Sequence, residues 1–199
     1  MLQVPQLRAP KGGSLPVGLL ACLNYDLRGG KRVGLGRGLV RFFFEPGFRA
    51  VATFRLAQWF RRARWNTLCV WAKWSGFRHT GADISLDSRI GRGLRLGHPN
   101  GVVIGAGVVI EENVTIYQQV TLGGRRREST APRNQRYPQV GARTVIYAGA
   151  KVLGAVRIGA DARIGANAVL LRDVPGGATA VGVPARIIEK PSSVCEELD

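Results

Sequence analysis

An aliphatic residue recurs at every sixth position through the second half of this 199-residue sequence. Two extra residues interrupt the repeat before Ile104, and the gap from Leu122 to Val140 is eighteen residues, which is three repeats. Neither the roughly 3.6-residue period of a helix nor the two-residue alternation of a strand produces this spacing. The positions in phase are Ile84, Ile90, Leu96, Ile104, Ile110, Ile116, Leu122, Val140, Ile146, Val152, Ile158, Ile164 and Leu170.

A solenoid accounts for this spacing, because each repeat supplies one short strand and one turn and three repeats close a triangular coil. The aliphatic residue fills the interior, and a small or β-branched residue such as Ala82 or Thr144 often stands two positions before it. We therefore expect a mainly β protein, a left-handed parallel β-helix of hexapeptide repeats with a small N-terminal α-helical cap.

The sequence divides into three regions. Residues 1–80 read as a basic α-helical region, irregular up to about residue 35 apart from a short helix near Leu19–Leu27. Residues 81–186 form the expected β-helix, and 187–199 a C-terminal tail. Within the β-helix, residues 124–138 are polar, basic and without a period, so they predict an external loop.

Positive charge is concentrated in the first region. Of the net charge of +16, residues 1–80 carry +12, from 14 Lys and Arg against Asp26 and Glu45. Such a segment attracts anionic surfaces, and its Trp and Arg content makes peripheral membrane contact one interpretation. Solvated helix faces are the other interpretation, while nucleic-acid binding has no supporting motif.

The cysteines and the apolar runs set the expected compartment. Cys22, Cys69 and Cys195 are scattered, which favours neither a disulfide framework nor a metal site. The sequence has no apolar run long enough for a membrane span and no secretory leader pattern. We expect a cytoplasmic protein, with the inner face of the membrane as a further possibility for the basic region.

The two-residue break in the repeat falls at His98, one of two histidines in the chain. A bulge at a corner pushes a side chain off a regular surface, which is common at active sites. Asp83 precedes His98 by fifteen residues, a little less than one coil, so its carboxylate could reach the imidazole. Such a pair suits a general base for attack by a hydroxyl, and no Ser or Cys is placed as an obvious nucleophile. His79 reads as a helix-end residue.

Two segments resemble the serine acetyltransferase-like branch of the hexapeptide acyltransferases. They are GADISLDSRIGRGLRLGHPNGVVIGAGVVIEENVTIYQQVTLGG and YPQVGARTVIYAGAKVLGAVRIGADARIGANAVLLRDVPGGATAVGVPARII, which together span Gly81 to Ile188. The resemblance implies acetyl-CoA as donor, no metal, and a homotrimer with active sites between subunits. His98 falls on the family's catalytic base and Asp83 on its carboxylate partner.

The resemblance also implies roles for residues around the base. The backbone N–H groups of Gly123 and Gly124 are candidates to stabilise the oxyanion. Small residues would let the pantetheine arm of CoA pass along the solenoid, and two arginines are candidates for its phosphates. These cofactor-binding candidates are Ala148, Gly149, Gly165, Ala166, Arg163 and Arg186.

Two positions depart from the pattern of the serine enzymes. Gly97 stands where those enzymes carry an Asp before the catalytic His, and Tyr137 replaces a His in an Arg-His-Pro stretch. The acceptor-binding candidates are Asp26, as the counterpart of another serine-binding carboxylate, and Tyr137. The Tyr-Pro variant and the short basic cap look more like members that O-acetylate exopolysaccharide sugars, such as those of colanic acid type.

This predicts an acetyl-CoA-dependent O-acetyltransferase that acts on a sugar of an exopolysaccharide or its lipid-linked precursor. The first alternative is serine O-acetyltransferase of cysteine biosynthesis. The second is a non-catalytic scaffold or membrane-associated binding module, which the intact Asp83 and His98 disfavour.

Overall fold

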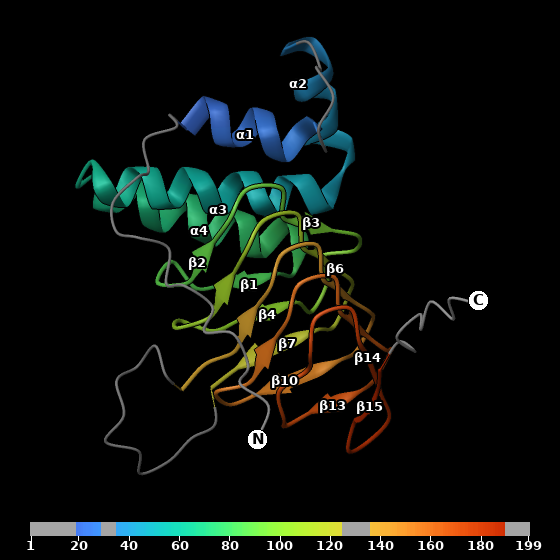
Figure 1. The fold of residues 1–199 in the computed structure, drawn as a ribbon. Helices are drawn as coiled ribbons and strands as arrows, with labels where there is room; N and C mark the ends of the chain where they lie inside the picture. The colour runs from blue at the N-terminus through green and yellow to red at the C-terminus, as the bar shows by residue number, and fades with distance from the viewer. Residues whose placement is uncertain (1–18, 29–34, 125–135, 190–199) are drawn as a thin grey trace.

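The computed structural model describes residues 19–28, 35–124 and 136–189. Four helices gather at one end of a stack of short strands (Figure 1). The helices are α1 (Leu19–Arg28), α2 (Leu35–Phe44), α3 (Pro46–Arg62) and α4 (Asn66–Thr80). The expected short helix near Leu19–Leu27 is therefore present. No helix in these described ranges is long and apolar enough to cross a membrane.

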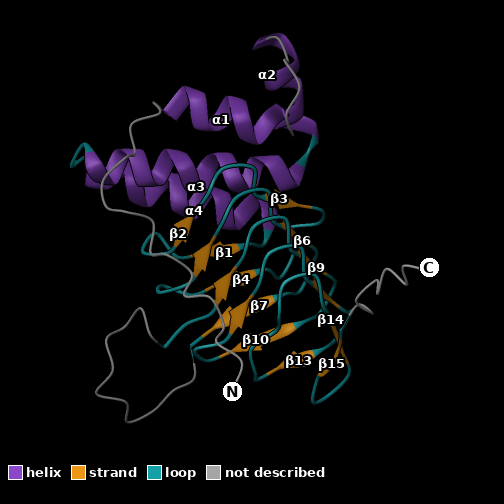
Figure 2. Ribbon diagram, viewed as in Figure 1, coloured by secondary structure: helices purple, strands orange, loops and turns teal. Residues whose placement is uncertain are grey.

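Fifteen strands of two or three residues follow the helices (Figure 2). They are β1 (Asp83–Ile84), β2 (Arg89–Ile90), β3 (Arg95–Leu96), β4 (Val103–Ile104), β5 (Val109–Ile110), β6 (Thr115–Ile116), β7 (Thr121–Gly123), β8 (Gln139–Val140), β9 (Val145–Ile146), β10 (Lys151–Leu153), β11 (Arg157–Ile158), β12 (Arg163–Ile164), β13 (Val169–Leu170), β14 (Thr179–Val181) and β15 (Arg186–Ile188). The boundary expected between the β-helix and the tail, after residue 186, thus falls inside β15.

Each of the first four coils contributes one strand to each of three parallel sheets, and the fifth coil adds β13 and β14. The first sheet has the order β1-β4-β7-β10-β13, the second β2-β5-β8-β11, and the third β3-β6-β9-β12-β14, with β15 added antiparallel. From β1 to β13, each strand pairs in register with the strand three places later wherever both are present, as Asp83 does with Val103 and Val103 with Thr121. This is the predicted left-handed parallel β-helix with a helical cap.

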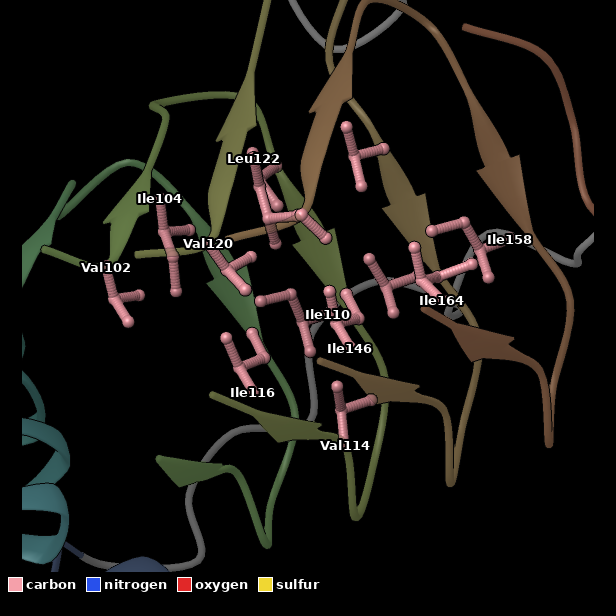
Figure 3. Close-up of a cluster of buried hydrophobic side chains, with 14 of the residues drawn as sticks. Val102, Ile104, Ile110, Val114, Ile116, Val120, Leu122, Ile146, Ile158 and Ile164 are labelled. Carbon is pink, nitrogen blue, oxygen red and sulfur yellow. The ribbon is translucent and has the colours of Figure 1, made fainter. Parts of the chain in front are cut away.

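The repeat of six works because strand side chains alternate between two faces. In a strand such as β4, Val103 faces outward while Ile104 points into the core. Successive coils stack these inward side chains on one another along the solenoid (Figure 3). Ile116, Ile146 and Ile164, one per coil of the third sheet, are fully buried.

The helical cap closes the open end of the first coil. A terminal coil exposes backbone groups that would otherwise pair with another coil. Arg55 of α3 donates to the carbonyl oxygens of Ile90 at 2.8 Å and Gly91 at 2.5 Å, and Arg61 donates to that of Leu86 at 2.7 Å. The cap thus holds the first coil, which carries Asp83 and ends at His98, on a rigid support.

Candidate active site

The bulge predicted at His98 lies at the corner between the third and first sheets. Six residues, 97–102, connect β3 to β4 there, whereas four residues, 117–120, connect β6 to β7 one coil later. The extra two residues leave the His98 side chain exposed. The register survives because Pro99 and Val102 are buried and the N–H of Gly101 bonds to the Gly81 carbonyl at 3.0 Å.

Asp83 lies in β1, directly beside β4, the strand that begins after the bulge. Its side chain is exposed and pairs with Lys73 of α4, with 3.7 Å between Oδ1 and Nζ. Within the described ranges, no hydrogen bond or ion pair joins Asp83 to His98. The predicted partners therefore share one edge of the coil, while the carboxylate is turned toward the helix.

The predicted cofactor-binding residues form a column at the same corner as His98. Ala148 and Gly149 connect β9 to β10, and Gly165 and Ala166 connect β12 to β13. Backbone bonds link the corners, from the Gly149 N–H to the Gln118 carbonyl and from the Gln119 N–H to the Asn100 carbonyl. Small side chains thus line a path that runs from the His98 bulge along the solenoid.

The two predicted phosphate-binding arginines lie on the third sheet, next to this corner. Arg163 is in β12 and Arg186 in β15, and both are exposed. The path and the arginines together could accommodate a long ligand with an anionic end. No cluster of three or more His, Cys, Asp or Glu side chains in the described ranges could hold a metal ion.

The predicted oxyanion residues and Tyr137 lie at a different corner. Gly123 ends β7 and its carbonyl accepts the Gly154 N–H at 2.9 Å, while Gly124 follows it at the corner between the first and second sheets. Residues 125–135 of the predicted external loop lie outside the described ranges. One strand of the first sheet therefore separates this corner from the His98 corner in every coil.

Asp26 requires a correction, because its carboxylate serves the fold. The side chain is buried, and its two oxygens accept the Arg55 Nε–H at 3.1 Å and the Gly93 N–H at 2.6 Å. Burial raises the pKa of the Asp26 carboxyl, outweighing the nearby Arg55 charge and the Gly93 hydrogen bond. With both oxygens engaged, Asp26 joins α1 and α3 to the first coil instead of facing an acceptor.

Sequence reasoning missed the side chains that fill the space around Gly97. The ring of Tyr117 lies against this glycine, so that a Cβ at position 97 would approach it to 2.9 Å. Tyr117 in turn stacks on Tyr147, with ring centroids 5.5 Å apart and planes 7° from parallel. Both tyrosines follow an inward isoleucine, at the position where other repeats carry Gly. This departure from the repeat was the sequence signal that could have identified them.

Gln118, beside Tyr117, was also missed. Its side-chain Oε1 is buried and has no hydrogen-bond partner in the described part of the chain. A buried polar atom without a partner is rare in folded proteins. Gln118 occupies the corner one coil beyond Asn100, so this oxygen belongs to the same column as the bulge.

Comparison with known proteins shows which family the chain belongs to. The sequence profile described as "Bacterial transferase hexapeptide (six repeats)" matches residues 137–172. A serine acetyltransferase of Helicobacter pylori (strain J99) is 44% identical over 145 residues, which cover 73% of this chain and 82% of that protein. The chain belongs to the serine acetyltransferase family of hexapeptide-repeat transferases.

Other members of the family are longer. A serine acetyltransferase of Synechococcus elongatus is 38% identical over 81% of this chain, which spans 65% of that relative. The solved structure of a serine acetyltransferase in complex with CoA matches with a TM-score of 0.70 and 32% identity, over 85% of this chain and 69% of that one. The structure of soybean serine acetyltransferase complexed with serine matches with a TM-score of 0.73 and 33% identity, again over 85% of this chain and 69% of that one.

The family confirms part of the sequence prediction and corrects part of it. Its members are acetyl-CoA-dependent acyltransferases, so the predicted class of enzyme and its donor are confirmed at the level of the family. The predicted saccharide acceptor is wrong, and so are the colanic-acid resemblance and the assignment to polysaccharide biosynthesis, since these relatives are named serine acetyltransferase.

The structure gives a packing reason for the two departures that led to the saccharide prediction. Gly97 leaves room for the Tyr117 ring, as described above. The Tyr137 ring lies against two glycines, where an added Cβ would approach it to 2.8 Å at Gly105 and 2.9 Å at Gly124. An aromatic ring therefore packs at each of the two departures.

Proposed function

We propose that this protein is a serine O-acetyltransferase that uses acetyl-CoA. The observation that carries the proposal is the exposed His98, held at a bulge beside the strand of Asp83 in a chain 44% identical to a serine acetyltransferase. The column of small residues that begins at the same corner supports CoA as the donor, and the likeness to a serine acetyltransferase bound to CoA adds to it.

In the proposed reaction His98 is the general base. One imidazole nitrogen takes the proton from the serine hydroxyl while the hydroxyl oxygen attacks the thioester carbonyl carbon of acetyl-CoA. The tetrahedral intermediate carries its negative charge on the former carbonyl oxygen, where backbone N–H groups near Gly124 stabilise it. The intermediate then expels the CoA thiolate, which takes the proton from the imidazolium, and O-acetylserine and CoA leave.

Asp83 has a positioning role in this proposal. A carboxylate that accepts the second imidazole N–H fixes the tautomer and favours the protonated ring that forms during attack. For this the side chain must turn from Lys73 toward His98. Its exposed side chain and the long 3.7 Å contact leave it free to do so.

We further propose that the site is completed by a second copy of the chain within a homotrimer. The His98 corner and the corner of Gly124 and Tyr137 lie on opposite edges of the first sheet. A neighbouring solenoid packed beside this sheet would bring the second corner of one copy to the first corner of the next. A head-to-tail interface of this kind closes into a ring.

The cellular place proposed for the protein is the cytoplasm, where acetyl-CoA and serine are both available. The basic N-terminal region does not contradict this placement, since a peripheral contact leaves the enzyme on the cytoplasmic side.

The decisive experiment measures thiol release from acetyl-CoA by the purified protein, with and without L-serine, and identifies the product by mass spectrometry. We expect serine-dependent release and O-acetylserine. His98→Ala should lower kcat by about 10²–10⁴-fold, the usual contribution of a general base. His79→Ala is the matched control, because His79 lies exposed in the last turn of α4 and bonds to the Ser75 carbonyl at 2.8 Å.

The proposal fails if serine does not accelerate thiol release, or if His98→Ala and His79→Ala lose activity equally. Absence of acetyl-CoA binding by calorimetry would favour the scaffold alternative instead.

A further inference from the structure

The helix α4 buries small side chains and exposes large apolar ones, the reverse of what is usual for a surface helix. The face that packs on α3 carries small buried residues: Cys69, Ala72, Gly76 and Thr80. The opposite face carries large apolar residues: Leu68, Val70, Trp71, Trp74 and Phe77, with exposed fractions of 42 to 68%. A helix that is apolar all round is normally covered on every side.

A second group of aromatic residues lies at the turn between α3 and α4. The rings of Trp59 and Trp65 meet at 5.6 Å between centroids, and Phe60 contacts both, at 5.2 and 5.9 Å. Trp59 and Trp65 are exposed. All four tryptophans of the chain lie between Trp59 and Trp74. We call the outer residues of α4, Leu68, Val70, Trp71, Trp74 and Phe77, the aromatic face.

Exposed arginines lie on the same two helices as the aromatic face. Residues 46–80 contain seven Lys and Arg and no acidic residue. Arg55, Arg61 and Lys73 pair with Asp26, Asp87 and Asp83 of α1 and the first coil, whereas Arg62, Arg64 and Arg78 are exposed. The Arg78 guanidinium lies over the Trp74 ring, 5.4 Å from its centroid. Tryptophan and arginine on one face are typical of helices that lie in the interface of an anionic bilayer.

The centre of the aromatic face points away from the catalytic sheet. Lys73 contacts Asp83 of β1, which fixes the side of α4 that faces the first coil. Trp71 is two residues before Lys73 and so lies about 200° around the helix axis from it. A neighbour that completed the active site along the first sheet would therefore leave Trp71 uncovered.

We propose that the aromatic face binds an anionic lipid surface and holds the enzyme peripherally on the membrane. A second copy fits the same face poorly, because a symmetric contact would place α3 and α4 of one copy, which carry no acid, against the same basic helices of the other. Anionic lipid headgroups supply the missing negative charge, and the bilayer interface accommodates the indole rings.

Vesicle binding tests this proposal directly. The full-length protein is mixed with phosphatidylcholine vesicles that contain or lack about 30 mol% phosphatidylglycerol, in about 0.05 or 0.5 M NaCl. We expect binding to the anionic vesicles, weakened by salt, and a blue shift of tryptophan fluorescence. The fluorescence reports on α3, α4 and the turn between them, since all four tryptophans lie between Trp59 and Trp74.

Two pairs of variants separate the apolar contribution from the charge. Trp71→Ser with Trp74→Ser should lower the partition coefficient at least about tenfold through lost apolar contact. Its control is Leu171→Ser with Ile188→Ser, which removes exposed apolar side chains from the far end of the solenoid and should leave binding unchanged.

Arg62→Gln with Arg78→Gln should lower binding to anionic vesicles about thirtyfold, and Arg157→Gln with Arg172→Gln should not. Absence of binding and of a fluorescence shift with anionic vesicles overturns the proposal, and so does equal, salt-insensitive binding to neutral vesicles. It is also overturned if the Trp71 and Trp74 variant changes the mass of the assembly in light scattering but not vesicle binding. None of these readouts depends on the acceptor of the reaction.

Discussion

At the scale of single residues, the Asp83 carboxylate contacts Lys73 of α4, whereas its proposed partner in catalysis is His98. The carboxylate pairs with Lys73 across the junction of cap and solenoid. If Asp83 orients His98 during catalysis, Asp83→Asn should lower kcat about tenfold to a hundredfold with little change in KM for serine. Lys73→Gln should leave kcat unchanged or raise it, because it releases the carboxylate. Steady-state kinetics of both variants check this, and a loss of activity in Lys73→Gln alone would contradict it.

Gly97 offers a second test at this scale. Gly97→Ala brings a Cβ to 2.9 Å from the Tyr117 ring, which must shift and weaken its stacking on Tyr147. We expect a loss of about 1 kcal/mol in the free energy of unfolding. Urea denaturation of Gly97→Ala, with and without Tyr117→Leu, measures this. If Gly97→Ala lowers the free energy of unfolding as much in the Tyr117→Leu background as in the wild type, contact with the Tyr117 ring is not the reason for a glycine at position 97.

The sequence could predict the bulge at His98 because a break in a strict period marks a residue displaced from a regular surface. It could not predict Lys73 as the neighbour of Asp83 or Tyr117 as the neighbour of Gly97. The Lys73 contact depends on how α4 packs against β1, and the Tyr117 contact on which side chain of the next coil leans over the glycine. The saccharide prediction relied partly on such positions, since Gly97 was interpreted as a lost carboxylate and Tyr137 as a replaced histidine, whereas a ring packs at each.

At the scale of elements, a buried ion pair between two helices of the cap helps to hold the cap on the solenoid. Asp26 of α1 and Arg55 of α3 are both buried and together bind backbone groups of Ile90, Gly91 and Gly93. Asp26→Asn leaves the Arg55 charge buried without its partner, which typically costs about 3–5 kcal/mol. We expect early loss of the helical signal in urea denaturation followed by circular dichroism.

The matched control is Asp161→Asn, which breaks the exposed pair between Asp161 and Arg143. An exposed ion pair is screened by solvent, so its loss should not move the unfolding midpoint detectably. Equal effects of the two variants would show that the Asp26 pair does not hold the cap. In the sequence Arg55 is one of many arginines on a helix, and its burial became visible only once α3 was placed across the first coil.

At the scale of the whole molecule, the site residues divide between two corners that one chain keeps apart. The strand β4 lies between the bulge at His98 and Gly105, against which the Tyr137 ring packs. The period of six predicted every coil and its corners, because each strand and turn follows from local spacing. Which corners meet depends on the packing of one solenoid against another, and no repeat within one chain encodes that.

The proposed shared site therefore predicts complementation between two inactive variants. His98→Ala removes the base from one corner, and Tyr137→Ala opens a cavity at the other, so each variant alone should lose serine-dependent thiol release. In mixed trimers, a site that takes His98 from one variant and Tyr137 from the other is intact. Random mixing restores about a quarter of the sites, and hence about a quarter of wild-type activity, after coexpression. Mixing the separately assembled variants at low temperature is the control, because subunits that do not exchange cannot form such sites. If coexpression restores nothing although mixed trimers are isolated through two affinity tags, both corners must act within one chain, and the shared site is wrong.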